Sequence, residues 1–171
     1  MIGSGDIGFL RELAEKFSRS IGADMDSVTY YANAAVVFKF FTDRGLTLEQ
    51  ACGVLAQADA ESTLRPAVVG DHGEAHGLFQ LHEERTAAIK RGCGIDVAIA
   101  NVAQQCAAVW WELQHSEHRA YRALLAAITA DEAGQVMCRL YERPASALQP
   151  AKRGQCAEKW KVYFLKNPVS S

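Results

Sequence analysis

Apolar residues recur at helical spacing along most of the chain, and capping residues, glycines and prolines separate the periodic segments. This pattern predicts a nearly all-helical protein. The predicted helices cover residues 8–19, 26–43, 47–61, 83–90, about 96–113 and about 116–129, then a helix capped by Asp131 and stopped by Pro144, and a last helix opened by Pro150. No internal repeat, low-complexity tract or linker interrupts the chain, so residues 1–171 are predicted to form a single domain.

Several details of these helices follow from local sequence. Thr47 and Gln50 fit a capping box, in which each side chain bonds a free backbone amide of the first turn. Asp96 is the predicted cap of the helix that runs to residue 113, with Ile99 facing inward. Leu125 and Ile128 are predicted to face inward in the following helix. The helix at 26–43 is apolar nearly all round, which predicts the central core helix.

Residues 70–82 break the helical pattern. Pro66 ends the preceding helix because its ring disfavours the α conformation at Arg65. Gly70, Gly73 and Gly77 then punctuate a polar segment that is expected to form a short hairpin or an irregular loop. The predicted fold class is therefore mainly α, a helical bundle with one glycine-rich loop or β-hairpin.

Composition excludes several functional classes. Of 171 residues, 49% are hydrophobic and 22% are charged, with a formal net charge of -2, which argues against nucleic acid as the main partner. The most apolar stretch, residues 34–41, is far shorter than the roughly 20 residues of a membrane span. The start of the chain lacks a basic region followed by an apolar run, so we expect synthesis in the cytoplasm without a signal peptide.

The cysteines and histidines do not predict a cofactor. The five cysteines are scattered without a C-x-x-C pair, which favours free buried thiols over a zinc site, with one disulfide as the alternative. His72, His76 and His82 lie close in sequence, but glycines separate them and the helical i, i+4 spacing of a metal pair is missing. We predict neither a metal nor a cofactor.

Carboxylates flank the break in the helical pattern. Glu61 lies at a helix end, close to the apolar line of Val54 and Ala58, and Asp71 and Glu74 follow within thirteen positions. Acid-catalysed cleavage of a glycosidic bond requires a carboxyl group that keeps its proton near neutral pH. Partial burial and the negative end of the helix dipole both raise a carboxyl pKa. The alternative is a solvated glutamate that bonds a backbone amide at the end of the helix.

The sequence from residue 45 to about 165 resembles the phage tail lysozyme family. Four motifs carry the resemblance, and they are Ala60-Glu61-Ser62-Thr63-Leu64-Arg65-Pro66, residues 69–80, Gln80-Leu81-His82-Glu83-Glu84-Arg85, and Tyr141-Glu142-Arg143-Pro144. Leu81 replaces the tryptophan usual in the family, and His76 stands where a larger aromatic residue is common. Residues 1–44 lie outside the resemblance and are expected to form helices packed on the domain.

The resemblance implies a lysozyme-like domain with a catalytic cleft between the helices and the loop. It implies that Glu61 is the catalytic acid and that bacterial peptidoglycan is the partner, cut at the β-1,4 bond between N-acetylmuramic acid and N-acetylglucosamine. Asp71 is the preferred second catalytic group, because the family also has aspartate there. The alternative for Asp71 is a turn-forming role.

Further residues are predicted to bind substrate, each with a structural alternative. They are Ser62, Gln80, His82, Glu74 and Tyr141. The alternatives are a helix cap for Ser62, an amide that bonds the loop backbone for Gln80, a cap of the next helix for His82 and a solvated loop residue for Glu74. For Tyr141 the alternative is part of a helix terminator, in which Arg143 or Glu142 bonds back to the helices. The tryptophans at 110, 111 and 160 are predicted to pack in the core.

Three functions remain open from the sequence. The first is a muramidase of the phage lysin type, which acts on the cell wall either in the periplasm as a free endolysin or from the virion. Such an enzyme is expected to be a monomer or part of a phage particle. The second is a lytic transglycosylase, which also uses one glutamate but lets the sugar's own 6-hydroxyl attack. The third is an inactive module that binds glycan or serves as a structural part of a phage tail.

Overall fold

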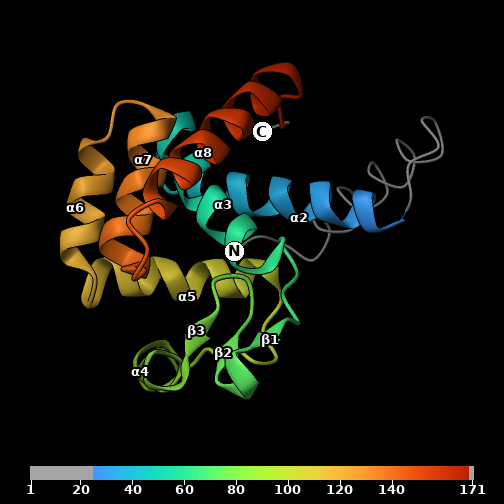
Figure 1. The fold of residues 1–171 in the computed structure, drawn as a ribbon. Coiled ribbons are helices and arrows are strands. Elements are labelled where there is room, and N and C mark those ends of the chain that lie inside the picture. Colours follow the sequence, from blue (N-terminus) through green and yellow to red (C-terminus); the bar gives the residue numbers. More distant parts are fainter. Residues whose placement is uncertain (1–24, 170–171) are drawn as a thin grey trace.

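The computed structural model describes residues 25–169, and the predicted helix at 8–19 lies outside them. Within this part the protein is mainly α, as predicted, with seven α-helices and a small three-stranded sheet (Figure 1). The helices are α2 (Met25–Thr42), α3 (Leu48–Ser62), α4 (Glu83–Cys93), α5 (Val102–His115), α6 (His118–Ala126), α7 (Ala130–Val136) and α8 (Gln149–Lys166). A 3-10 turn, η1 (Asp71–Gly73), and a π-helical segment, η2 (Met137–Glu142), complete the helical elements.

Helix α3 is the enclosed centre of the fold. It packs against α2, α7 and α8, and Figure 1 shows it lying between them. Residues 50–58 are all buried, whereas α2 mixes buried, partly buried and exposed positions. The prediction that the helix at 26–43 is the central one is therefore wrong. The small residues of α3 explain the difference, because at Gly53 the helix comes so close to Ala133 of α7 that a Cβ atom would lie 2.5 Å from the alanine Cβ.

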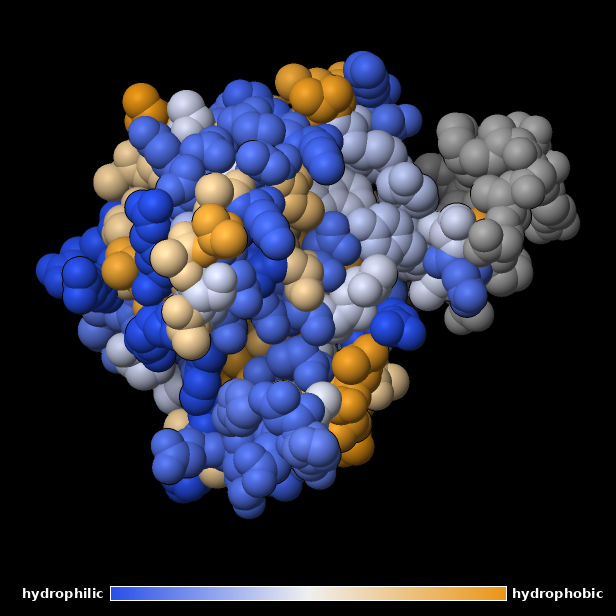
Figure 2. Space-filling view, viewed as in Figure 1, coloured by the Kyte–Doolittle hydropathy of each residue, from blue (hydrophilic) through white to orange (hydrophobic). Residues whose placement is uncertain are grey.

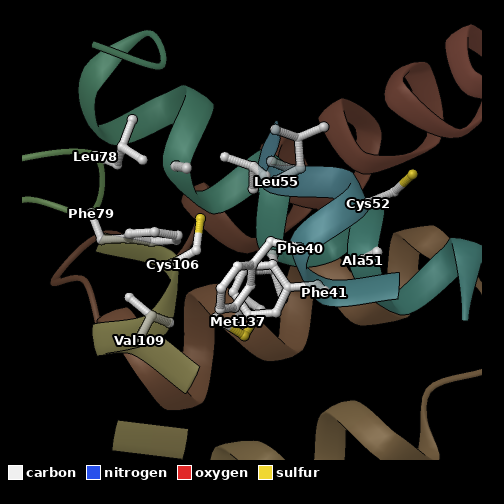
Figure 3. Close-up of a cluster of buried hydrophobic side chains, with 14 of the residues drawn as sticks. Phe40, Phe41, Ala51, Cys52, Leu55, Leu78, Phe79, Cys106, Val109 and Met137 are labelled. Atoms are coloured by element: carbon white, nitrogen blue, oxygen red, sulfur yellow. The ribbon is translucent and has the colours of Figure 1, made fainter. Parts of the chain in front are cut away.

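A continuous hydrophobic core joins the helices to the glycine-rich segment. Phe40 and Phe41 of α2 meet Leu55 of α3 in this core, and Phe79 reaches it from the loop (Figure 3). Met137 of η2 belongs to the same core. Because Phe79 is 1% exposed, the loop is anchored to the helices by burial of a large side chain.

The segment at 69–82 forms a three-stranded antiparallel sheet in the order β1 (Val69–Gly70), β2 (Ala75–His76) and β3 (Leu81–His82). Val69 pairs with His76, and Ala75 pairs with His82. Gln105 of α5 holds this segment, since its Oε1 accepts from Leu78 N–H at 2.7 Å and its Nε2 donates to Pro66 O at 2.9 Å. The expected hairpin is thus present and fixed to α5.

Two predicted helix starts are wrong. Helix α5 begins at Val102, where Asn101 and Gln104 form a capping box, and Ile99 is 85% exposed rather than inward. Helix α7 is capped by Thr129 with Glu132, not by Asp131. In both cases a second capping residue lies a few positions from the predicted one. Helix α6 ends at Ala126, and Leu125 and Ile128 are exposed rather than inward.

Two other predicted helix starts are confirmed. The capping box of Thr47 and Gln50 opens α3, and Pro150 lies in the first turn of α8. Cys52, Cys93, Cys106, Cys138 and Cys156 are free thiols, three of them buried. Between residues 25 and 169, no helix is long and apolar enough to cross a membrane.

Candidate active site

The backbone leaves helix α3 one residue after Glu61. Ser62 is the last helical residue, and Thr63 and Leu64 both adopt left-handed conformations, with φ of 53° and 57°. This conformation is strained for a residue with a bulky side chain. Burial holds it, because Leu64 is fully buried and Asn33 of α2 donates a hydrogen bond to its carbonyl at 2.9 Å. The result is a fixed helix end that carries a carboxyl group.

The Glu61 carboxylate is held by two donors. Arg153 of α8 approaches Glu61 Oε1 with its Nη2 at 2.6 Å, and Gln57, one turn earlier on α3, approaches with its Nε2 at 3.0 Å. Arg153 Nε also donates to Gln57 Oε1 at 3.0 Å. The side chains of Glu61 and Arg153 are only 19% and 9% exposed, so this ion pair is largely screened from water.

A second carboxylate lies beside the first. The Nε2 group of Gln57 also donates to Glu142 Oε2 at 3.3 Å, so one amide nitrogen bonds two carboxylates. Glu142 is the last residue of η2, and Arg143 then turns left-handed with φ of 60°. We refer to Gln57, Glu61, Glu142 and Arg153 as the Glu61 cluster.

The surroundings of Glu61 raise the pKa of its carboxyl group. Burial raises the pKa of this carboxyl above its ordinary value, and the negative charge of Glu142 raises it further. Arg153 and the hydrogen bond from Gln57 act in the opposite direction without cancelling the rise, and Asp71 makes the smallest contribution, also upward. A carboxyl group with a raised pKa on a fixed helix end is suited to general acid catalysis.

Asp71 lies in η1, between β1 and β2, in the lobe formed by the sheet, whose surface is largely hydrophilic in the view of Figure 2. Its φ is 44° and that of His72 is 56°, so the turn is tightly wound. Asp71 Oδ2 lies 3.2 Å from His82 Nε2, with side chains 67% and 56% exposed. The structure therefore brings Asp71 and His82 together, and the charge of Asp71 reaches Glu61 only weakly.

Comparison with known proteins places the chain in a family. The family described as phage tail lysozyme matches residues 32–164, which include the whole Glu61 cluster and Asp71. The chain belongs to the phage tail lysozyme family. A search of curated proteins gave no match. Membership agrees with the mainly α, lysozyme-like fold and indicates a function directed at peptidoglycan.

Two residues that are predicted to bind substrate form hydrogen bonds to backbone carbonyl groups. Ser62 is 3% exposed and its Oγ donates to Ala58 O at 3.1 Å. Gln80 Nε2 donates to Val68 O at 3.1 Å and Gly77 O at 2.9 Å. The contacts of Gln80 match its structural alternative, whereas the C-cap of α3 is Thr63 and Ser62 is still helical. Glu74 is exposed on the lobe, near Asp71.

Tyr141 does not fit the expected direct contact with substrate, because it is fully buried. Its hydroxyl donates to Glu112 Oε2 at 2.6 Å, and the guanidinium of Arg85 lies over its ring at 4.3 Å. Arg85 also bonds both oxygens of Glu112, at 2.8 and 2.9 Å. This network ties α4 to α5 and η2, so Tyr141 contributes to the packing of these elements.

The sequence did not identify three members of the Glu61 cluster as site residues. Gln57 precedes Glu61 by four positions, so the two share a helix face, and this spacing was an available signal. Glu142 was considered only as part of a helix terminator, and its bond to Gln57 agrees with that interpretation. No pattern in the sequence pointed to Arg153 as a site residue. Between residues 25 and 169, no group of three histidine, cysteine or acidic side chains is placed to hold a metal.

Proposed function

We propose that the protein is a muramidase that hydrolyses the β-1,4 bond between N-acetylmuramic acid and N-acetylglucosamine. The observation that carries this proposal is the Glu61 carboxyl, which is fixed at the end of α3 and whose pKa is raised by burial and by the charge of Glu142. Membership of the phage tail lysozyme family supports it. The enzyme would reach the cell wall either as a free endolysin or from the virion.

Glu61 is the general acid in this mechanism. It donates its proton to the glycosidic oxygen as the bond to the anomeric carbon breaks, which leaves an oxocarbenium-like carbon and a neutral leaving hydroxyl. Arg153 and Gln57 then stabilise the new carboxylate, because both already donate to Glu61 Oε1. Water adds to the anomeric carbon, and its proton restores Glu61 or is taken by Asp71.

Asp71 is the proposed second group, acting on the anomeric carbon directly or through a water molecule that it positions. Its exposed carboxylate leaves it open to substrate, and it lies 3.2 Å from His82 Nε2. We also propose that His82 and Glu74, both exposed on the same lobe, hydrogen-bond the glycan or its peptide stem. Ser62 and Gln80 would shape the site through the backbone that they hold.

Digestion of purified peptidoglycan tests the proposal, with soluble products read by mass spectrometry. The wild type is expected to release reducing disaccharide-peptides, and Glu61→Gln is expected to lose about 10²–10⁴-fold in rate. Glu84→Gln is the matched control, since Glu84 is an exposed glutamate on α4. Anhydro products would instead identify a lytic transglycosylase. Absence of products from a folded wild type that binds peptidoglycan would indicate an inactive binding module.

A further inference from the structure

The side-chain amide of Gln57 connects three charged groups. Its nitrogen donates to Glu61 Oε1 at 3.0 Å and to Glu142 Oε2 at 3.3 Å, and its oxygen accepts from Arg153 Nε. The two carboxylate oxygens share one donor atom, so they lie within about 6 Å of each other. Gln57 is fully buried, which fixes this geometry.

Charge balance around Gln57 depends on one proton. Two carboxylates face a single guanidinium, and between residues 25 and 169 Arg153 forms an ion pair with Glu61 but not with Glu142. Like charges this close disfavour ionisation of both groups, whereas an adjacent cation favours it. Glu142 and Arg153 therefore act on the same carboxyl group in opposite directions.

We propose that Glu142 and Arg153 are positioning residues that set the proton occupancy of Glu61, with Glu142 retaining the proton before bond cleavage and Arg153 stabilising the carboxylate afterwards. This inference rests on the proposed function, because it concerns the group that acts as the general acid. Neither residue needs to touch the substrate. Both act through Glu61 and Gln57.

The remaining groups that face Glu61 do not replace these two. Asp71, from η1, has the smallest effect on the pKa of Glu61, and it is largely solvated. Cys138, from η2, is buried and its own thiol pKa is raised, so it carries no charge at neutral pH. Glu142 is thus the main negative neighbour and Arg153 the main positive one.

The local fold holds Glu142 in place. The π-helical segment ends at Glu142, where Arg143 N–H donates to Cys138 O at 2.8 Å. The guanidinium of Arg143 then bonds both oxygens of Glu117 at 2.9 Å, which anchors the end of η2 to the start of α6. π-Helical turns occur frequently at functional sites, and here the turn presents a carboxylate to the site.

The pH dependence of peptidoglycan cleavage tests the inference. A general acid is active while protonated, so the alkaline limb of the profile reports the pKa of Glu61. Glu142→Gln removes a negative charge and is expected to move this limb to lower pH. Arg153→Gln removes a positive charge and is expected to move the alkaline limb to higher pH. The midpoints of the limb in Glu142→Gln and Arg153→Gln are expected to differ by roughly tenfold or more in proton concentration. Glu84→Gln and Arg122→Gln, at exposed positions on α4 and α6, are controls expected to leave the limb in place.

A second readout does not depend on activity. The side-chain carboxyl ¹³C signal of Glu61, assigned by its loss in Glu61→Gln, is titrated by NMR in the wild type and in both variants. Opposite displacements of its midpoint support the inference even if cleavage is undetectable, in which case only the proposed function fails. Unmoved midpoints in active variants overturn the inference and leave the function standing. If Arg153→Gln does not fold, Glu142→Gln alone decides, since a midpoint that stays in place or rises contradicts the proposal.

Discussion

Tyr141→Phe separates a structural role of this residue from a substrate contact. The substitution removes one hydroxyl group and keeps the ring, so it creates almost no cavity. The hydroxyl donates to the buried carboxylate of Glu112 at 2.6 Å, while Arg85 still bonds both oxygens of that carboxylate after the change. Glu112 therefore keeps partners and is not left as an uncompensated buried charge.

The expected cost follows from these contacts. A hydrogen bond to a charged group contributes about 1.5–3 kcal/mol, and the remaining bonds from Arg85 favour the lower part of this range. We expect the free energy of unfolding to fall by about 2 kcal/mol. For a chain of this length that is a decrease of about 4–8 °C in Tm.

Thermal and denaturant unfolding followed by circular dichroism measures this effect, with peptidoglycan co-sedimentation in parallel. Tyr121→Phe is the matched control, because its ring packs on Trp110 and its hydroxyl makes no hydrogen bond to any residue between 25 and 169. The control is expected to change stability by less than about 0.5 kcal/mol. An unchanged Tm together with weakened binding by Tyr141→Phe would refute the buried network and restore the substrate contact.

Three further predictions concern packing, linkage and the second carboxylate. Gly53→Ala is expected to lower the free energy of unfolding by about 1–3 kcal/mol in a denaturant titration, because the new Cβ would meet the Cβ and backbone of Ala133. Helix propensity alone predicts a gain of about 1 kcal/mol, and such a gain would contradict the close packing of α3 on α7. The raised pKa of Glu61 means that its neutral form is favoured in the folded state, so its contribution to stability is complete below the unfolded pKa and is lost as pH rises through the folded pKa. Stability of the wild type should therefore fall relative to that of Glu61→Gln over this interval, and a constant difference across it would refute the raised pKa. Asp71→Asn is expected to slow peptidoglycan cleavage while leaving Tm unchanged, since the side chain is 67% exposed; full activity would remove Asp71 from the mechanism.

Local sequence rules predicted the helices well because each rule rests on contacts within one turn. The capping box at Thr47 and Gln50 is an example, since both hydrogen bonds span three residues. The same rules gave the wrong helix start near Asp96 and near Asp131. Asp96 caps only a turn, through Ala98 N–H, and pairs with Lys90, while Asn101 starts the helix. Which of two nearby capping residues starts a helix is decided by packing.

Glu61 was predictable for a different reason. Pro66 ends α3 within a few residues and leaves a carboxyl group at the boundary between the helices and the loop. Its partners were not predictable from periodicity, because Glu142 lies 85 positions from Gln57 and Arg153 lies 92 positions from Glu61. Only the packing of η2 and α8 against α3 brings them together. The burial of Tyr141 depends on the same packing.

The origin of the oxygen atom in the product tests the central claim most directly. Peptidoglycan is digested by the wild type in water enriched in ¹⁸O, and the masses of the released muropeptides are measured. Hydrolysis initiated by Glu61 predicts a reducing end that carries one ¹⁸O atom introduced by cleavage, with no such product from Glu61→Gln. Anhydro products without ¹⁸O, or equal release by Glu61→Gln, would contradict the account.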